Sequence, residues 1–295
     1  MQNQQDFDSL LGHSLFAGAN EGNARRTFIQ TAVGAGFAAA ALPICAQSVI
    51  STDSDGLTAG FVILEINGQQ VPVYRAQPAG KNNLPVVLVI SEIFGVHEHI
   101  ADVARRFAKQ GYLALAPELF VRQGDAGKYP SIAELIKEVI SKVPDAQVMS
   151  DLDAVVAWAK TQGGNTDKLA ITGFCWGGRI TWMYAAHNPL VKTGAAWYGR
   201  VTGTPTALSP QNPVDIAARL KAPILGLYGA KDAGITQESL EQMKAALDKA
   251  GNKSEIVVYA NSGHAFHADY RASYVEADAK DGWQRCLAWF KANLA

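Results

Sequence analysis

Residues 171–178 read Ile-Thr-Gly-Phe-Cys-Trp-Gly-Gly, at the end of an apolar run typical of a buried strand. The spacing of Gly173, Cys175 and Gly177 is that of a nucleophile elbow, in which the reactive residue lies on a sharp turn between a strand and a helix. Flanking glycines allow the close backbone approach that such a turn requires. A helix N-terminus directed at the thiol favours the thiolate. The alternative is a buried cysteine in a tight packing turn.

Apolar runs and amphipathic segments alternate on both sides of this stretch. Short apolar runs predict strands, and apolar residues spaced three or four apart predict helices. Asn67 and Gly68, between two apolar runs, predict an opening β-hairpin. The expected strands are 61–66, 71–74, 86–91, 113–116, 168–172, 193–197, 224–228 and 255–259, and the expected helices are 99–110, 131–141, 147–161, 237–250 and 281–294, besides the elbow helix. This alternation predicts an α/β fold, a mostly parallel sheet with helices on both faces.

The composition is that of one ordinary globular domain behind a leader. The chain has 295 residues, 48% of them hydrophobic, and a net charge of -1. It can therefore bury a large core, and its charge argues against nucleic acid as a partner. The cysteines at 45, 175 and 286 suit neither a disulfide framework nor a zinc site. His97, Glu98 and His99 are more typical of a solvated helix entry than of a metal ligand set, so we expect no metal site there.

The N-terminus differs in composition from the rest of the chain. Arg25 and Arg26 precede a weakly apolar run rich in alanine and glycine, which resembles a twin-arginine export signal. Its apolar part, residues 31–44, is too short to span a bilayer. We expect residues 1–50 to be a leader cleaved near residue 46, residues 56–295 to form the catalytic domain, and the mature protein to be periplasmic and not inserted in the membrane. The alternative is a cytoplasmic protein with a short interfacial or disordered arm.

Two residues meet the requirements for partners of Cys175. Asp232 and His264 each follow an apolar strand, and functional groups of an open α/β sheet belong at the carboxyl ends of strands. The order nucleophile, acid, histidine is that of α/β-hydrolases. His264 would accept the thiol proton and later protonate the leaving oxygen, and Asp232 would fix the imidazole tautomer. Each residue alone could equally be an ordinary loop residue.

The loop after residues 86–91 reads Glu92-Ile93-Phe94-Gly95. In hydrolases of this architecture it supplies one oxyanion-hole N–H, and the residue after the nucleophile supplies the other. We therefore expect the backbone N–H groups of Ile93 and Trp176 to form the oxyanion hole. Glu92 lies at the lip of the site, where its carboxylate could contact the resting thiol. Trp197 and Tyr198 adjoin a strand end and are expected to line the pocket.

Together these motifs resemble the dienelactone hydrolase family, also called carboxymethylenebutenolidases. The resemblance extends from about residue 60 to the C-terminus and is carried by residues 92–95, 110–112, 116–119 and 173–178, Asp232, and residues 263–266. It implies an α/β-hydrolase fold and the opening of enol lactones without metal or organic cofactor. It also implies Cys175 as nucleophile, His264 as base, Asp232 as its orienting group, and Glu92 as a carboxylate that interacts with the thiol before substrate binds.

The chain departs from this family where arginines hold the substrate carboxylate. Ala268 stands at one such position, and the other falls in residues 131–139, which contain no arginine. Arg122, Arg200 and Arg271 could replace them because guanidinium pairs well with carboxylate, and spacing does not choose among the three.

The sequence therefore predicts an enzyme that opens a small-molecule lactone or small carboxylic ester through a thioester on Cys175. Two alternatives stay open: a broad-specificity carboxylesterase or thioesterase, and a catalytically silent binding protein of the envelope with the same fold.

Overall fold

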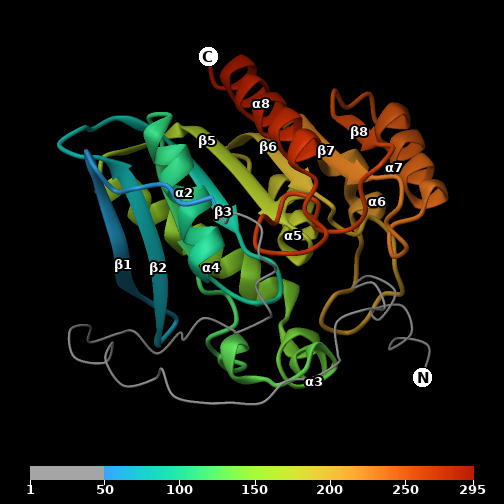
Figure 1. Ribbon diagram of the computed structural model, residues 1–295, viewed down its shortest axis with the longest axis horizontal. Coiled ribbons are helices and arrows are strands. Elements are labelled where there is room, and N and C mark those ends of the chain that lie inside the picture. Colours follow the sequence, from blue (N-terminus) through green and yellow to red (C-terminus); the bar gives the residue numbers. More distant parts are fainter. Residues whose placement is uncertain (1–49) are drawn as a thin grey trace.

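The structure, a computed structural model, describes residues 50–295 (Figure 1). The expected export signal, with Arg25, Arg26 and the cleavage near residue 46, lies outside the described residues. None of the helices between residues 50 and 295 combines the length and the apolar character that crossing a bilayer requires.

Eight strands form one sheet in the order β1-β2-β4-β3-β5-β6-β7-β8. The first two strands form an antiparallel hairpin, β2 also pairs antiparallel with β4, and the later neighbours are all parallel. The strands are β1 (Leu57–Ile66), β2 (Gln69–Pro78), β3 (Leu84–Ile90), β4 (Leu113–Pro117), β5 (Gly164–Phe174), β6 (Val191–Trp197), β7 (Ile224–Gly229) and β8 (Glu255–Tyr259). The predicted mostly parallel sheet with an opening hairpin is confirmed.

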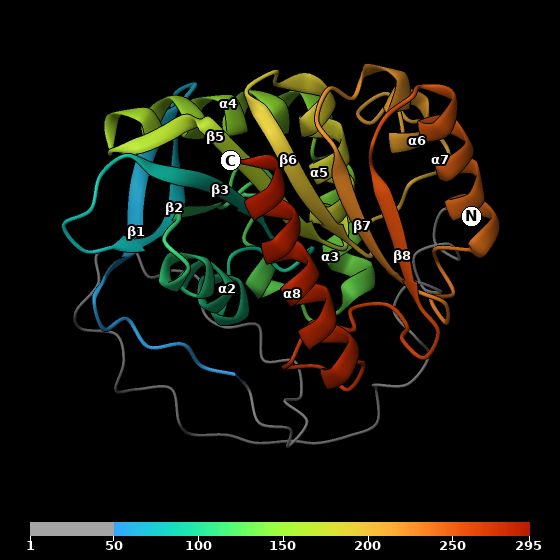
Figure 2. The same ribbon diagram turned by 90° about the horizontal axis from the view of Figure 1, so that it is seen from above.

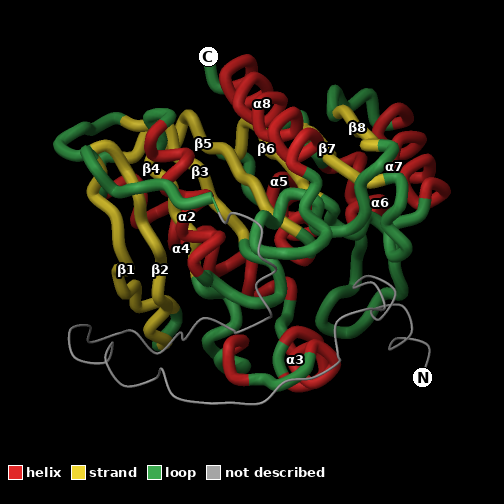
Figure 3. The backbone as a smooth tube through the Cα atoms, in the orientation of Figure 1, coloured by secondary structure: helices red, strands yellow, loops and turns green. Residues whose placement is uncertain are grey.

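Helices cover both faces of this sheet. Figure 2 shows α2 (Glu98–Lys109) and α8 (Glu276–Asn293) on one face and α4 (Asp145–Thr161) and α5 (Trp176–His187) on the other. The central strands are buried on both faces, which explains why they read as continuous apolar runs. Within residues 50–295 the other α-helices are α3 (Ile132–Glu138), α6 (Pro213–Ile216) and α7 (Gln237–Lys249), seen with the strands in Figure 3.

Several element boundaries differ from the expected ones, among them the outer ends of β1 and β2, which extend to Leu57 and Pro78, and three others with a local cause. Helix α3 ends at Glu138, because Val139 has φ -122° and the chain continues as a 3-10 turn. Strand β5 begins at Gly164 rather than 168, since its first residues pair with the start of β3 across an irregular register. Helix α8 begins at Glu276, five residues earlier than the apolar period indicates, with Glu276 and Asp278 in its acidic first turn.

The carboxyl ends of β3, β5, β7 and β8 meet at one edge of the sheet. The loop after β7 is joined to the loop after β8, since Ala230 N–H donates to the Tyr259 carbonyl and Lys231 N–H to the Ser262 carbonyl, both at 2.9 Å. This edge therefore carries the loops with Glu92, Asp232 and His264 and the elbow.

Candidate active site

Cys175 lies on a strained turn between β5 and α5. Its φ of 55° is costly for a residue with a side chain, by about 1–3 kcal/mol, and such strain is concentrated at functional sites. Its N–H donates to the Trp197 carbonyl at 3.0 Å. A Cβ on Gly173 would lie 2.2 Å from the Gly177 carbonyl oxygen, and one on Gly177 would lie 2.4 Å from that of Ile90. Backbone contacts thus require both glycines of the elbow.

His264 and Asp232 form a buried pair on the neighbouring loops. Nδ1 of His264 lies 2.7 Å from Oδ2 of Asp232, and Oδ1 of Asp232 accepts the Gly234 N–H at 2.9 Å. A carboxylate at Nδ1 fixes the tautomer that presents Nε2 as the reactive nitrogen. Nε2 is buried and has no hydrogen-bond partner among the described residues. The pair therefore leaves one imidazole nitrogen for a reacting group.

The charge state of His264 depends on Cys175. Burial opposes an imidazolium, but the negative charge of the Cys175 thiolate and the hydrogen bond that His264 donates to Asp232 outweigh it and raise the pKa of His264 to about 10. The charge of Cys175 is the largest of the influences that favour the imidazolium. A thiolate and an imidazolium held together are the activated form of a cysteine nucleophile.

Glu92 is a buried carboxylate in the loop after β3, at the same edge of the sheet. Its Oε2 accepts the Tyr270 hydroxyl at 2.5 Å, and its Oε1 lies 4.0 Å from Nη1 of Arg271. Burial would raise the pKa of Glu92, but the charge of Arg271 and the hydrogen bond from Tyr270 bring it below its usual value. Oε1 has no hydrogen-bond partner among the described residues. One oxygen of a charged carboxylate is thus left for the thiol or for a ligand.

Tyr198 and Trp197 lie differently, although both follow the same strand. Tyr198 has φ 37°, its ring meets that of His264 edge-on at 5.2 Å, and its buried hydroxyl has no partner in residues 50–295. Burial raises the pKa of Tyr198 well above 10, so the hydroxyl keeps its proton. Trp197 is a core side chain, whose Nε1 donates to Thr172 Oγ1 at 3.2 Å. Its ring stacks on Phe174, and its contact with the elbow is the backbone carbonyl that accepts the Cys175 N–H.

The three candidate arginines have separate surroundings. Arg122 pairs with Asp151 at 2.5 Å and donates to the Ile66 carbonyl at 2.9 Å, which joins β1 to α4. Arg200 is half-buried in the loop after β6. Arg271 lies against Glu92, and its Cζ is 5.7 Å from the centre of the Phe94 ring. The structure thus brings Arg271 to the site residues and gives Arg122 structural partners.

The loop after β3 is held against the elbow helix. Because Gly177 packs on the carbonyl groups of Ile90 and Ser91, the start of α5 with Trp176 N–H lies beside the loop that carries Ile93. A residue whose role the sequence analysis missed also holds this loop in place. Glu118, which follows β4, accepts the Val96 N–H at 2.8 Å. Its Oε1 lies 2.5 Å from where a Cβ on Gly95 would be, and Gly95 has φ 73°.

Glu118 is expected to make folding stability depend on pH. Burial and the charge of Asp125, only partly offset by the Val96 N–H, raise its pKa to about 7 from an ordinary 4.5. An acid whose pKa is raised on folding binds its proton more tightly in the folded state, so stability falls as the pH rises from about 4.5 through about 7. In thermal unfolding at several pH values, Glu118→Gln should gain stability relative to wild type over this range. Parallel pH dependence of the two proteins would contradict the assignment.

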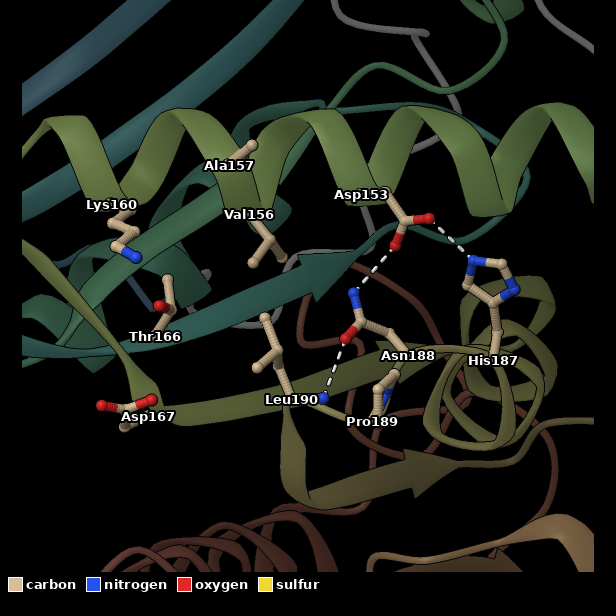
Figure 4. Close-up of a pocket in the computed structure, with 10 residues that line it drawn as sticks. All are labelled: Asp153, Val156, Ala157, Lys160, Thr166, Asp167, His187, Asn188, Pro189 and Leu190. Carbon is tan, nitrogen blue, oxygen red and sulfur yellow. Dashed lines mark hydrogen bonds and ion pairs between the residues drawn. The ribbon is translucent and has the colours of Figure 1, made fainter.

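Two surface hollows lie away from these residues. One, of about 390 Å³, is formed by α4, the start of β5 and the turn after α5 (Figure 4). There the Asp153 carboxylate binds the His187 ring at 2.7 Å and the Asn188 amide at 2.8 Å, so both of its oxygens already have partners. A second, of about 680 Å³, lies between the start of β3 and the end of α8. Neither is lined by a predicted site residue.

The histidine and acidic residues at the start of α2 have protein partners. His99 Nδ1 lies 2.9 Å from Asp269 Oδ1, and Glu98 pairs with Arg105. Within residues 50–295, no group of three or more His, Cys, Asp or Glu side chains is arranged to hold a metal ion.

Comparison with known proteins agrees with this architecture. Residues 71–294 match the model of the Dienelactone hydrolase family. The chain is 57% identical over 268 residues to a protein of Methylorubrum extorquens provisionally named carboxymethylenebutenolidase, covering 90% of this chain and 92% of that protein. A protein of Escherichia coli with the same provisional name is 54% identical over 257 residues, 87% of this chain and 94% of its own.

A solved structure gives the same answer for the fold. The crystal structure of a provisionally named dienelactone hydrolase from Klebsiella pneumoniae superposes with a TM-score of 0.79 at 57% identity, over 80% of this chain and 98% of that one. The α/β-hydrolase fold expected from the elbow is therefore confirmed. Because the family match covers most of the chain and the relatives match over nearly their whole length, the chain belongs to the dienelactone hydrolase family.

Proposed function

We propose that this protein hydrolyses a lactone or small carboxylic ester with Cys175 as nucleophile, His264 as base and Asp232 as the group that orients His264. The observation that supports this most is the buried His264–Asp232 pair, with Nε2 unpaired beside a strained cysteine whose charge raises the pKa of the imidazole. Family membership and the names of the relatives support the same reaction class.

The proposed reaction proceeds through a thioester. The thiolate of Cys175 attacks the acyl carbon, and the carbonyl oxygen becomes an oxyanion facing the N–H groups of Ile93 and Trp176. The carbon–oxygen bond of the ester then breaks, and the leaving oxygen takes the proton of His264. Water, deprotonated by the now neutral His264, attacks the thioester, which releases the acid and restores thiolate and imidazolium. Loss of one oxyanion donor typically lowers the rate about 10²- to 10³-fold.

We further propose that Arg271 binds a carboxylate of the substrate. Its guanidinium lies against Glu92 and over Phe94 at the site, whereas Arg122 is engaged by Asp151. A hydrogen bond to a charged group contributes about 1.5–3 kcal/mol, so Arg271→Met should raise KM for an acidic lactone about 10- to 100-fold. For a neutral aryl ester, the change in KM should be small.

Steady-state kinetics on both substrates tests this role, with Arg122→Met as the matched control. The control should change KM for both substrates equally or not at all. A loss of the same size for the acidic and the neutral substrate in Arg271→Met would contradict carboxylate binding, since it would reflect only the altered surroundings of Glu92.

The substrate preference decides between the two enzymatic alternatives. Turnover of a dienelactone beside p-nitrophenyl acetate should favour the lactone if the protein is a lactonase. A preference for the simple ester would move the assignment to a broad-specificity carboxylesterase or thioesterase. Turnover of neither, by a protein that binds the lactone, would favour the catalytically silent binding protein.

We also propose export to the periplasm, which rests on Arg25 and Arg26 and the apolar run after them. Cell fractionation of a variant with both arginines changed to lysine tests it, and an unchanged cell fraction would contradict it.

A further inference from the structure

Asp269 is a buried carboxylate that lies outside the proposed catalytic steps, yet it has three donors. Its Oδ1 lies 2.9 Å from Nδ1 of His99, and its Oδ2 accepts Nη2 of Arg106 at 2.9 Å and the N–H of Ile50 at 3.2 Å. Its side chain is 1% exposed. His99 and Arg106 belong to α2, and Ile50 is the first described residue. One carboxylate thus joins three segments that are far apart in sequence.

The next two residues of the chain contact Glu92. Tyr270 donates its hydroxyl to Oε2 of Glu92, and Arg271 lies 4.0 Å from Oε1. The Tyr270 ring meets the rings of His97 and His99 at 4.9 Å and 5.2 Å. Burial lowers the pKa of His97 to about 4, so this ring packs on Tyr270 as a neutral group. His97 and His99 therefore pack against Tyr270, in the loop whose residues 270 and 271 contact Glu92.

Residues 50–55, which we call the N-terminal strap, cross α2 to reach this point (Figure 1). The Thr52 N–H donates to Asp102, and Nε of Arg105 donates to the Thr52 carbonyl at 2.7 Å. Nζ of Lys109 donates to the Asp55 carbonyl at 2.8 Å. The strap lies before residue 71, where the match to the family begins. It thus adds a donor to Asp269 from outside the family-matched region.

We infer that Asp269 is a positioning residue of the active site: His99, Arg106 and the N-terminal strap hold it in place, and it sets Tyr270 on Glu92. The inference rests on the proposed function, in which Glu92 acts beside Cys175. Catalytic groups must be held to within a fraction of an ångström, and a displacement of about 1 Å can lower the rate about 10²-fold. A carboxylate one residue from Tyr270, fixed by three donors, supplies such a restraint.

A double-mutant cycle on kcat/KM tests the inference, with p-nitrophenyl acetate as the test ester. Asp269→Asn keeps the shape of the side chain but removes the charge that holds Arg106. It should lower kcat/KM about 10-fold in the wild-type background. In a Tyr270→Phe background it should lower kcat/KM by less than about twofold, because the contact through which Asp269 acts is already lost. The same factor in both backgrounds, or no loss in either, would overturn the inference.

A second carboxylate with several hydrogen-bond partners serves as a control for general destabilisation. Asp153 also binds a histidine, a tyrosine and an asparagine, namely His187, Tyr184 and Asn188, and Figure 4 shows its contacts with His187 and Asn188. Asp153→Asn should lower the unfolding temperature and leave kcat/KM unchanged. A fall in kcat/KM as large as that of Asp269→Asn would show that the loss follows general destabilisation and would overturn the inference.

A second variant keeps the test open if Asp269→Asn does not fold. Ile50→Pro removes the N–H that the strap donates to Asp269, at a residue that is 39% exposed, and Ile50→Ala, which keeps the N–H, is the control for loss of the side chain. Ile50→Pro should lower kcat/KM about threefold in wild type and not in Tyr270→Phe. Unchanged activity in both backgrounds would overturn the claim that the N-terminal strap helps to position Asp269. If Cys175→Ala stays active, the proposed function fails; if Cys175→Ala is inactive and the cycle is additive, the positioning alone fails.

Discussion

Replacing Cys175 by alanine is expected to lower kcat/KM for ester or lactone hydrolysis by at least about 10⁴-fold. Without the thiol no thioester forms, and the oxyanion N–H groups and the binding residues retain only a residual acceleration, as in other triad hydrolases that lose the nucleophile. Initial rates of the purified variant and of wild type measure the loss. Its fold should be unchanged, because the strain at φ 55° belongs to the backbone turn and the replacement removes only the sulfur.

Cys286→Ala is the matched control for this prediction. Cys286 is fully buried in α8, and burial raises the pKa of its thiol well above the usual value, so it is not a nucleophile. Its replacement should lower stability through lost packing and leave kcat/KM unchanged. Equal activity of Cys175→Ala and wild type would remove the basis for the mechanism.

Asp232→Asn is expected to lower kcat/KM about 10³-fold while the fold is retained. An amide at this position no longer holds the His264 tautomer that presents Nε2, and in a serine protease the corresponding change lowers kcat about 10⁴-fold. The bond it alters is the 2.7 Å contact with Nδ1 of His264. Comparison of initial rates and of thermal unfolding for variant and wild type separates loss of catalysis from loss of folding.

The same variant should change the pH dependence in a stated direction. In wild type the pKa of His264 is about 10, so the imidazolium that protonates the leaving oxygen persists until the pH approaches that value. Since Asp232 raises this pKa, its loss should move the alkaline limb of kcat/KM to lower pH. An alkaline limb that stays in place would show that Asp232 does not act on His264.

The main elements of the fold could be predicted because local patterns dominate there. Continuous apolar runs marked the central strands, and Asn67 and Gly68, with φ 52° and 75°, marked the hairpin. Boundaries that depend on pairing could not be predicted in this way. The first residues of β5 are polar and join the sheet only because β3 lies beside them.

The site was predictable where a residue follows a strand end and less so where contacts are tertiary. The order of Cys175, Asp232 and His264 pointed to one sheet edge. Nothing in the local sequence marks Tyr270 as a partner of Glu92, since their contact joins residues 178 positions apart. The role of Glu118 beneath Gly95 depends in the same way on β4 lying next to β3.

The most direct test of a cysteine nucleophile is to find the acyl group on it. We would mix the protein with p-nitrophenyl acetate, quench in acid within the first turnover, and locate acetyl groups by peptide mass spectrometry. The account predicts an acetyl group on the peptide containing Cys175, formed with a burst of p-nitrophenol that is absent in Cys175→Ala. An acetyl group on a different residue, together with an equal burst from Cys175→Ala, would contradict it.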